Sequence, residues 1–232
     1  MPSRRSLKTE LESIFQSVLQ RRTDLDYRRG KKSMKARKDS VYEAYLYAIA
    51  CQALHEMGCM PVAVNSQGNL FVVRRAPARL DTTRWTCSYV SFTKNKVNYE
   101  LYCDVKVMSR SPGVTLEVDI LILPAKYALD CDNAGIHPDF KELRLLVEAK
   151  NHAKGIDMAL AKSFVGICDR LRTKISVTAL VSSGPARGSA QALLHGLRPP
   201  SPLLDNVYGP IATSASPIDF KDLLKRELNT VL

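Results

Sequence analysis

The chain has 232 residues, 45% of them hydrophobic, which is enough for one substantial core. Its 34 lysines and arginines outweigh 23 acidic residues, and the resulting formal charge of +11 argues for a polyanionic partner such as nucleic acid. The six cysteines contain no C-x-x-C pair, and no apolar run is long enough for a membrane span or a signal peptide, so we expect an intracellular, cytoplasmic protein without structural zinc or a membrane partner.

The N-terminal segment, residues 1–38, is expected to form a basic helical arm with its linker. Apolar residues at helical spacing in 5–22 predict an amphipathic helix that needs a partner surface, and a basic connector follows at 23–39. Residues 1–38 hold twelve basic and four acidic residues, a net of +8. Such an arm is either a solvated tail or a clamp on the backbone phosphates of nucleic acid. The candidate contacts are Arg28, Arg29, Lys31, Lys32, Lys35 and Lys38.

Residues 39–232 are expected to form one α/β domain. An apolar-rich helix is predicted from Asp39 to Gly58, after which the period changes to that of strands. The predicted strands span 69–75, 84–93, 97–108, 113–124, 143–150 and 175–183. The later predicted helices span 155–174, 186–197 and 216–228, while the polar stretch 124–142 is expected to loop out. This order predicts a mixed β-sheet flanked by helices, with the helical arm attached.

Two of the predicted strands carry charged residues among apolar ones. Alternation along 115–123 places Glu117 and Asp119 on one face of the strand. The opposite face then holds Val118, Ile120 and Ile122. In the next strand, Glu148 and Lys150 share a face. If the two strands are neighbours, Asp119, Glu148 and Lys150 meet at one point. The alternative is a set of exposed strand-end charges, which the surrounding apolar residues disfavour.

Two carboxylates held close together repel each other unless a cation lies between them. A hard, oxygen-seeking ion such as Mg²⁺ suits that arrangement and keeps water in its remaining positions. A neighbouring lysine can orient one such water or help to deprotonate it. The pattern therefore predicts a site for metal-assisted hydrolysis, with Glu117 as a reserve ligand or ion-pair partner.

The arrangement of Asp119 and Glu148-Ala149-Lys150, downstream of a helix that carries Glu43, resembles the PD-(D/E)xK nuclease superfamily. The resemblance covers roughly residues 40–195 and implies the restriction-endonuclease-like fold. It implies that Asp119, Glu148 and the carbonyl of Ala149 hold Mg²⁺, for which Mn²⁺ can substitute. By the same resemblance Lys150 positions the attacking water, and Glu43 is an accessory catalytic carboxylate.

Three features complicate this resemblance. Val118 stands where the family has its namesake proline, and the long spacing between Asp119 and Glu148 requires an insertion. Glu43 also has a structural explanation, because Ser40 and Glu43 fit a capping box at the start of the predicted helix. The choice between capping and catalysis stays open for this residue.

The resemblance implies a Mg²⁺-dependent nuclease that hydrolyses phosphodiester bonds of DNA, in preference to RNA, as the effector subunit of a restriction or phage-defence system. Because no helicase or specificity domain is recognisable, we expect a companion protein subunit or a homo-oligomer. The alternative is a non-catalytic module that binds nucleic acid or a partner protein through the same fold and its basic arm. In a third hypothesis the amphipathic helix of the arm assembles oligomers.

Overall fold

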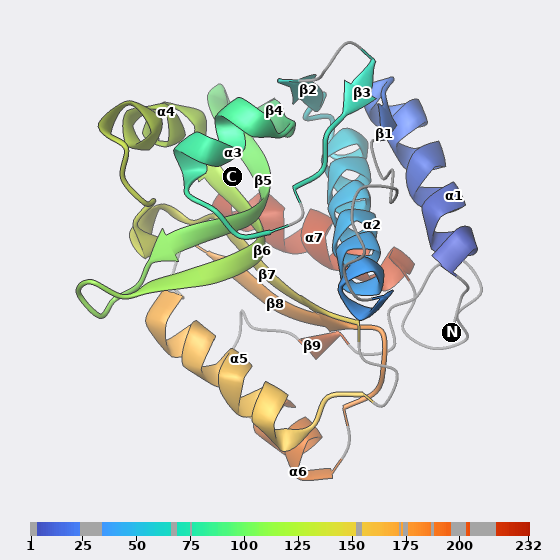
Figure 1. Cartoon of the computed structure of the whole chain (residues 1–232), viewed down its shortest axis with the longest axis vertical. Helices are drawn as coiled ribbons and strands as arrows, with labels where there is room; N and C mark the ends of the chain where they lie inside the picture. Colours follow the sequence, from blue (N-terminus) through green and yellow to red (C-terminus); the bar gives the residue numbers. More distant parts are fainter. Residues whose placement is uncertain are drawn as a thin grey trace.

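The computed structural model describes residues 4–23, 34–65, 69–74, 76–151, 155–171, 173, 176–186, 188–195, 203–204 and 217–232. These residues form an α/β structure in which helices cover both faces of a mixed sheet (Figure 1). The sheet has seven strands in the order β2-β4-β5-β6-β7-β8-β9, and a separate small sheet pairs β1 with β3. The α/β class and the mixed, helix-flanked sheet expected from the sequence are confirmed.

The large sheet changes direction at β7. Neighbouring strands run antiparallel from β2 to β7, whereas β7, β8 and β9 run parallel to one another. Its longest strands, β5 and β6, are rich in the β-branched and aromatic residues that fit a pleated surface. The strands are β2 (Val62–Val64), β4 (Tyr89–Lys94), β5 (Val97–Met108), β6 (Thr115–Pro124), β7 (Leu145–Lys150), β8 (Val177–Ser182) and β9 (Leu203–Leu204).

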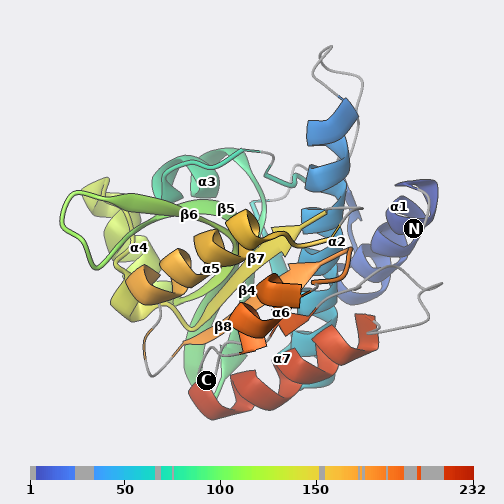
Figure 2. The same ribbon diagram turned by 90° about the horizontal axis from the view of Figure 1, so that it is seen from below.

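The helices divide between the two faces of the sheet (Figure 2). Helices α1, α2 and α7 share one core with the sheet, whereas α3, α4 and α5 share another on the opposite face. Helix α6 packs against α5 over β8. The helices are α1 (Arg4–Ile14), continued by a π-helical turn η1 (Phe15–Leu19), α2 (Met34–Glu56), α3 (Leu80–Thr86), α4 (Ala125–Ala134), α5 (Met158–Leu171), α6 (Gly188–His195) and α7 (Pro217–Val231). Among the described residues, no helix is long and apolar enough to cross a bilayer.

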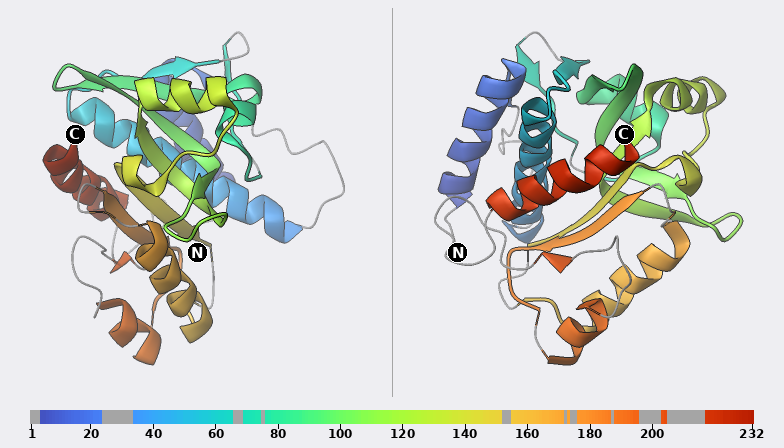
Figure 3. Two further views of the ribbon diagram at one scale, coloured as in Figure 1. Left: turned by 90° about the vertical axis from the view of Figure 1, so that its left-hand side faces the viewer. Right: turned by 180° about the vertical axis from the view of Figure 1, so that it is seen from behind.

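Helix α1 is part of the main core. It lies alongside α2 (Figure 3), and its apolar side chains are buried in the same cluster as those of α2. The ring of Phe15 lies 6.3 Å from that of Tyr47 in α2 and 4.8 Å from that of Phe71 in β3 (Leu70–Phe71). The partner surface that the amphipathic helix requires is thus supplied by the chain itself. The domain boundary expected after residue 38 falls inside α2.

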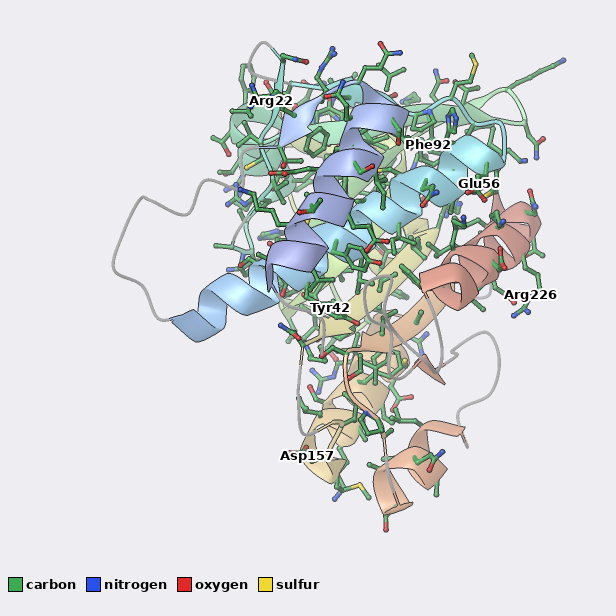
Figure 4. All side chains as sticks on the ribbon, turned by 90° about the vertical axis from the view of Figure 1, so that its right-hand side faces the viewer. Arg22, Tyr42, Glu56, Phe92, Asp157 and Arg226 are labelled. Atoms are coloured by element: carbon green, nitrogen blue, oxygen red, sulfur yellow. The ribbon has the colours of Figure 1, made fainter. Side chains whose placement is uncertain are left out.

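The C-terminal end of α2 is linked to helix α7 by ion pairs. Glu56, near the end of α2, lies beside α7, which carries Arg226 on its outer side (Figure 4). The Nζ atoms of Lys221 and Lys225 lie 2.6 and 3.0 Å from the two carboxylate oxygens of Glu56. Two segments that are distant in the sequence, α1 and α7, therefore both depend on α2 for their position.

Two predicted elements were wrong in type or extent. The strand predicted at 84–93 begins as the end of α3, and β4 starts only at Tyr89. Helix α3 is held in place because the guanidinium of Arg84 pairs with Glu100 of β5 and with Asp132 of α4, a tertiary contact that overrides β-propensity. The strand predicted at 69–75 is reduced to β3, which pairs with β1 (Arg22–Thr23).

The polar stretch expected to loop out at 124–142 contains helix α4. Its inner side chains, Ala128 and Cys131, are fully buried against the sheet, although the charged residues around them hide this apolar face in the sequence. Gly135 ends the helix with a φ of +62°, a left-handed conformation that glycine adopts without steric cost. The insertion is therefore an additional helix on the sheet, and it brings β7 back beside β6.

Because Phe15 is fully buried between aromatic rings, we expect Phe15→Ala to lower the free energy of unfolding by about 3–5 kcal/mol in urea denaturation. Lys8→Ala on the solvated side of α1 is the control and is expected to change it by less than about 1 kcal/mol. A comparably small effect of Phe15→Ala would show that the packing of η1 against α2 and β3 contributes little to the core.

Candidate functional site

The candidate site begins where β6 and β7 separate. The pairing between these strands ends at Ile120 and Val147, so the backbone N–H of Ala149 has no strand partner on that side. The carboxylate of Asp119 accepts a hydrogen bond from this N–H at 2.6 Å. A buried N–H needs such a partner, which explains why a charged side chain lies inside the sheet at this position.

Glu148 and Lys150 approach Asp119 from β7. The ammonium group of Lys150 contacts the carboxylate of Glu148 and lies 3.9 Å from Oδ2 of Asp119. Both acids are buried, with exposed fractions of 5% for Asp119 and 8% for Glu148. Val147 and Ala149 point into the core under α2, so Glu148 and Lys150 share the other face of the strand. The predicted meeting of Asp119, Glu148 and Lys150 is confirmed, and their catalytic role stays a prediction.

The carbonyl of Ala149 faces the gap that opens between β6 and β7 beyond Ile120 and Val147. In an extended strand, the N–H and C=O of one residue point toward the same neighbouring strand, and the N–H of Ala149 is bonded to Asp119. The carbonyl of Lys150 points the opposite way, because it accepts a hydrogen bond at 3.0 Å from the N–H of Ser183 after β8. Three oxygen donors expected for a metal ion therefore border one gap: two carboxylates and one carbonyl.

The regular alternation predicted for β6 is interrupted at Asp119. Ile120 and Ile122 pack into the core under α2, whereas Val118 packs on the opposite face, so these residues do not share one face as expected. The cause lies in β5, where Asp104 has a left-handed backbone with φ of +52°. Residues of β5 and β6 pair in the same register on both sides of Asp104, so the alternation of side chains between the two faces is interrupted in both strands at the same level. Asp104 and Asp119 lie opposite each other at this level, and neither is paired in the ladder.

A cluster of three carboxylates results from this irregularity. Oxygen atoms of Asp104, Glu117 and Asp119 all lie within 4.8 Å of one another. Asp104 was not among the residues predicted from the sequence, and Glu117 was predicted only as a reserve ligand or ion-pair partner. Pairing residues outward from the turn between 97–108 and 115–123 places Asp104 opposite Asp119, but a lone aspartate in an apolar strand is not in itself a signal of a functional site.

The electrostatics of the site are those of crowded, buried acids. Burial, together with the charges of Asp119 and Glu117, raises the pKa of Asp104 to about 8. Burial and the charge of Asp119 raise the pKa of Glu148 to about 7, although Lys150 opposes this rise. Burial also raises the pKa of Asp119, against Lys150 and the N–H of Ala149. The site therefore holds more carboxyl groups than Lys150 can balance once they ionise, so several of them keep their protons to higher pH than usual.

The pKa of Lys150 is raised as well, which for a lysine favours the charged form. Burial by itself would lower its pKa, but the carboxylates of Glu148 and Asp119 more than compensate, and the pKa of Lys150 lies above its ordinary value. The side chain is therefore an ammonium ion at neutral pH. It can donate hydrogen bonds and stabilise negative charge, but in this state it has no lone pair with which to remove a proton.

Glu43 reaches this neighbourhood from α2. Its charge contributes to the raised pKa of Lys150, so it lies within electrostatic range of the site. The helix-cap explanation for Glu43 was wrong, because α2 begins at Met34 and Ser40 lies inside the helix. A capping box requires its serine at the first, non-helical position. The catalytic role suggested for Glu43 stays a prediction.

The expected nucleic-acid contacts of the arm are only partly visible. Lys35 and Lys38 lie in the first turns of α2, not in a separate connector, and their side chains are not described. The other candidate contacts, Arg28, Arg29, Lys31 and Lys32, lie outside the described residues.

Comparisons with known proteins do not identify a family. No family model matches the chain, and no curated protein matches it. One solved structure, protein VC1899 from Vibrio cholerae, aligns at 13% identity with a TM-score of 0.36. The alignment covers 88% of this chain and 36% of that one, so the chain spans about a third of the length of VC1899. A likeness at this level supports no conclusion about fold family or function.

The raised pKa values predict a pH-dependent stability for the metal-free protein. The folded chain binds protons at Asp104 and Glu148 up to pH of about 8 and 7, whereas unfolded carboxyl groups lose them near pH 4. Stability contributed by these groups is complete below about pH 4 and is lost as the pH rises through 7 and 8, by up to about 1.4 kcal/mol per pH unit and group.

Urea denaturation at pH 6 and pH 8.5 in EDTA measures this loss. Asp104→Asn is the matched control, because its amide does not titrate, and we expect it to lose less stability than the wild type over the same interval. Equal losses in the two proteins would contradict the assignment of a proton to Asp104.

Proposed function

We propose that the chain is a Mg²⁺-dependent nuclease of restriction-endonuclease-like fold that hydrolyses phosphodiester bonds of DNA. The observation that carries the proposal is the meeting of Asp119, Glu148 and Lys150 at the point where two strands separate. Burying like charges side by side is costly, and it is most easily explained if the site binds a cation. The α/β architecture and its mixed sheet are compatible with this fold family.

The donor set suits a hard divalent cation. The carboxylates of Asp119 and Glu148 and the carbonyl of Ala149 offer only oxygen, the ligand that Mg²⁺ and Mn²⁺ prefer, and no thiol or imidazole is part of the set. A bound Mg²⁺ would neutralise charge on a scissile phosphate and acidify a coordinated water.

The second group that the proposed reaction needs, besides the cation, is the side chain of Lys150. Its ammonium group is held by Glu148 and Asp119, so its position is fixed before substrate arrives. From there it would donate a hydrogen bond that orients the attacking water and would stabilise the negative charge that develops on the phosphate. Glu43, whose charge helps to raise the pKa of Lys150, would act as the accessory carboxylate.

The charge of the chain supports a nucleic-acid substrate. The formal +11 is concentrated in the first 38 residues, where it would bind backbone phosphates without regard to sequence. We propose DNA in preference to RNA, and a role as the effector subunit of a restriction or phage-defence system that works with a companion subunit or as a homo-oligomer.

One observation favours a different function. The contact between Lys150 and Glu148 neutralises one carboxylate internally, so this pair can exist without a metal ion. A non-catalytic module that binds nucleic acid or a partner protein would need no more than that. It predicts salt-sensitive binding to DNA and no cleavage with any divalent cation.

Cleavage of plasmid DNA in the presence of Mg²⁺ separates the two functions. We expect Asp119→Asn and Lys150→Met to reduce the rate by at least about 100-fold, because each removes a group that holds or stabilises charge at the phosphate. Asp130→Asn is the matched control, since Asp130 is exposed on α4 and pairs only with Lys126 among the described residues. Full activity in both site variants would refute the nuclease assignment.

The basic arm has its own test. Replacing Arg28, Arg29, Lys31 and Lys32 by glutamine should weaken DNA binding, and the slope of log affinity against log salt should fall by about 0.9 for each phosphate that is no longer neutralised. Fluorescence anisotropy with a labelled duplex at several salt concentrations measures both. An unchanged salt slope would mean that these residues form a solvated tail.

A further inference from the structure

We propose that the chain forms a two-fold dimer with a second copy of itself through an apolar patch on strand β2 and helices α3 and α4. We define this α3–α4 patch by four exposed side chains, Val62, Trp85, Leu129 and Ile136. None of them belongs to the candidate site. The inference therefore goes beyond the proposed function and holds whether or not the chain cleaves DNA.

Exposed apolar side chains gather in one region of the described chain. The large ones lie in or next to β2, α3, α4 and the turn between β4 and β5, and they are Met60, Val62, Trp85, Val97, Leu129 and Ile136. Trp85 is 78% exposed, and tryptophan is enriched where protein interfaces gain most of their affinity. Figure 1 shows α3 and α4 on the side of the molecule opposite to α1.

Contacts between β2 and α3 bring Val62 and Trp85 to one surface. The side-chain amide of Asn65, the residue after β2, donates a hydrogen bond at 2.6 Å to the carbonyl of Arg84, so Trp85 lies beside the end of β2. Val62 lies two strands from Glu100 in the same row of the ladder, and the guanidinium of Arg84 pairs with Glu100. Both apolar side chains therefore border the buried Arg84.

Contacts between α3 and α4 extend this surface to the other two residues. Arg84 also pairs with Asp132 of α4 at 3.2 Å, and Leu129 stands three residues before Asp132, on the same side of the helix. The guanidinium of Arg79, just before α3, donates a hydrogen bond to the carbonyl that precedes Ile136. The patch is thus carried by helices that are already fixed to each other, so binding costs little ordering.

The charge of the patch suits a second copy. Helices α3 and α4 carry two basic and three acidic residues, a net of −1, and β2 carries no charge. The rest of a chain of +11 therefore holds +12. Two such chains repel each other over most of their surface, but not through a face that has almost no net charge. A two-fold interface sets one patch against the same patch, so its own charge must be small.

The position of the patch also favours a second copy. Residues 1–38 carry a net of +8 and include α1, which lies on the opposite side of the molecule from α4 (Figures 1 and 3). A dimer joined through α3 and α4 keeps the two α1 helices on its outer sides, where their repulsion is weak. An acidic companion protein would instead be attracted to the basic arm.

Trp85 gives a direct test, because it is the only tryptophan in the chain. Sedimentation velocity of the nucleic-acid-free wild type should show a shift from monomer to dimer as the protein concentration rises. Tryptophan emission should move to shorter wavelength over the same range, and acrylamide quenching should fall, because association removes Trp85 from water. Added salt should not weaken the dimer, since it screens the repulsion between the two positive chains.

Substitutions within the patch should prevent association. We expect Leu129→Glu and Ile136→Glu each to weaken the dimer by at least about 10-fold, because each places an unpaired carboxylate in an apolar interface. Both positions are exposed, so folding should be little affected. Ser163→Glu is the matched control. It adds the same charge at an exposed position of α5, outside the patch, and should dimerise like the wild type.

A wild type that stays monomeric at every concentration would overturn the inference, as would Leu129→Glu and Ile136→Glu variants that dimerise as tightly as the wild type. Thermal melts establish that each variant is folded. Plasmid cleavage measured on the same samples separates this inference from the proposed function. A dimer that depends on Leu129 and Ile136 but cleaves no DNA would uphold the patch and refute the nuclease. Cleavage by a protein that sediments only as a monomer would do the reverse.

Discussion

The hydrogen bond from the N–H of Ala149 to the carboxylate of Asp119 is the interaction that holds the site together. Two strands that had been paired separate at Ile120 and Val147, and a separated strand leaves backbone groups without partners. Asp119 satisfies one of these groups and in doing so brings a charge into the interior. Glu148 and Lys150, which follow on the separated part of β7, then face the same gap. A local break in pairing thus becomes a place where charged side chains meet.

The energetic consequence is a site whose crowded, buried acids resist ionisation. Burial raises the pKa of Asp104, Asp119 and Glu148, and their mutual repulsion adds to this for Asp104 and Glu148, while Lys150 remains protonated beside them. Such crowding weakens the fold when the acids ionise and becomes favourable when a cation binds. Without a bound cation, ionisation of these acids is therefore expected to lower the free energy of unfolding. Proteins tolerate such a cost where the groups have a function.

The remainder of the architecture keeps the gap in position. Helix α2 covers the face of the sheet behind the site and is itself held between α1 and α7, which are the two ends of the described chain. On the other face, Arg84 links α3, β5 and α4 through Glu100 and Asp132. Because β5 and β6 carry Asp104, Glu117 and Asp119, contacts that restrain this hairpin also restrain these three carboxyl groups.

The order of residues alone predicted the class of the fold, the strands β5 to β8, and the convergence of Asp119, Glu148 and Lys150. Runs of β-branched and aromatic residues mark each strand locally, and strands that follow each other along the chain are commonly neighbours in a sheet, as β6 and β7 are. It did not predict helix α3, whose Arg84 is paired across the structure, or helix α4, whose apolar face is hidden among charges. Nor did it reveal that α1 belongs to the main core. Counting along the hairpin places Asp104 opposite Asp119, but only the tertiary structure decided that both carboxyl groups gather with Glu117 in the interior. The left-handed backbone of Asp104 interrupts the alternation of side chains in both strands, and such an interruption leaves no pattern in the order of residues.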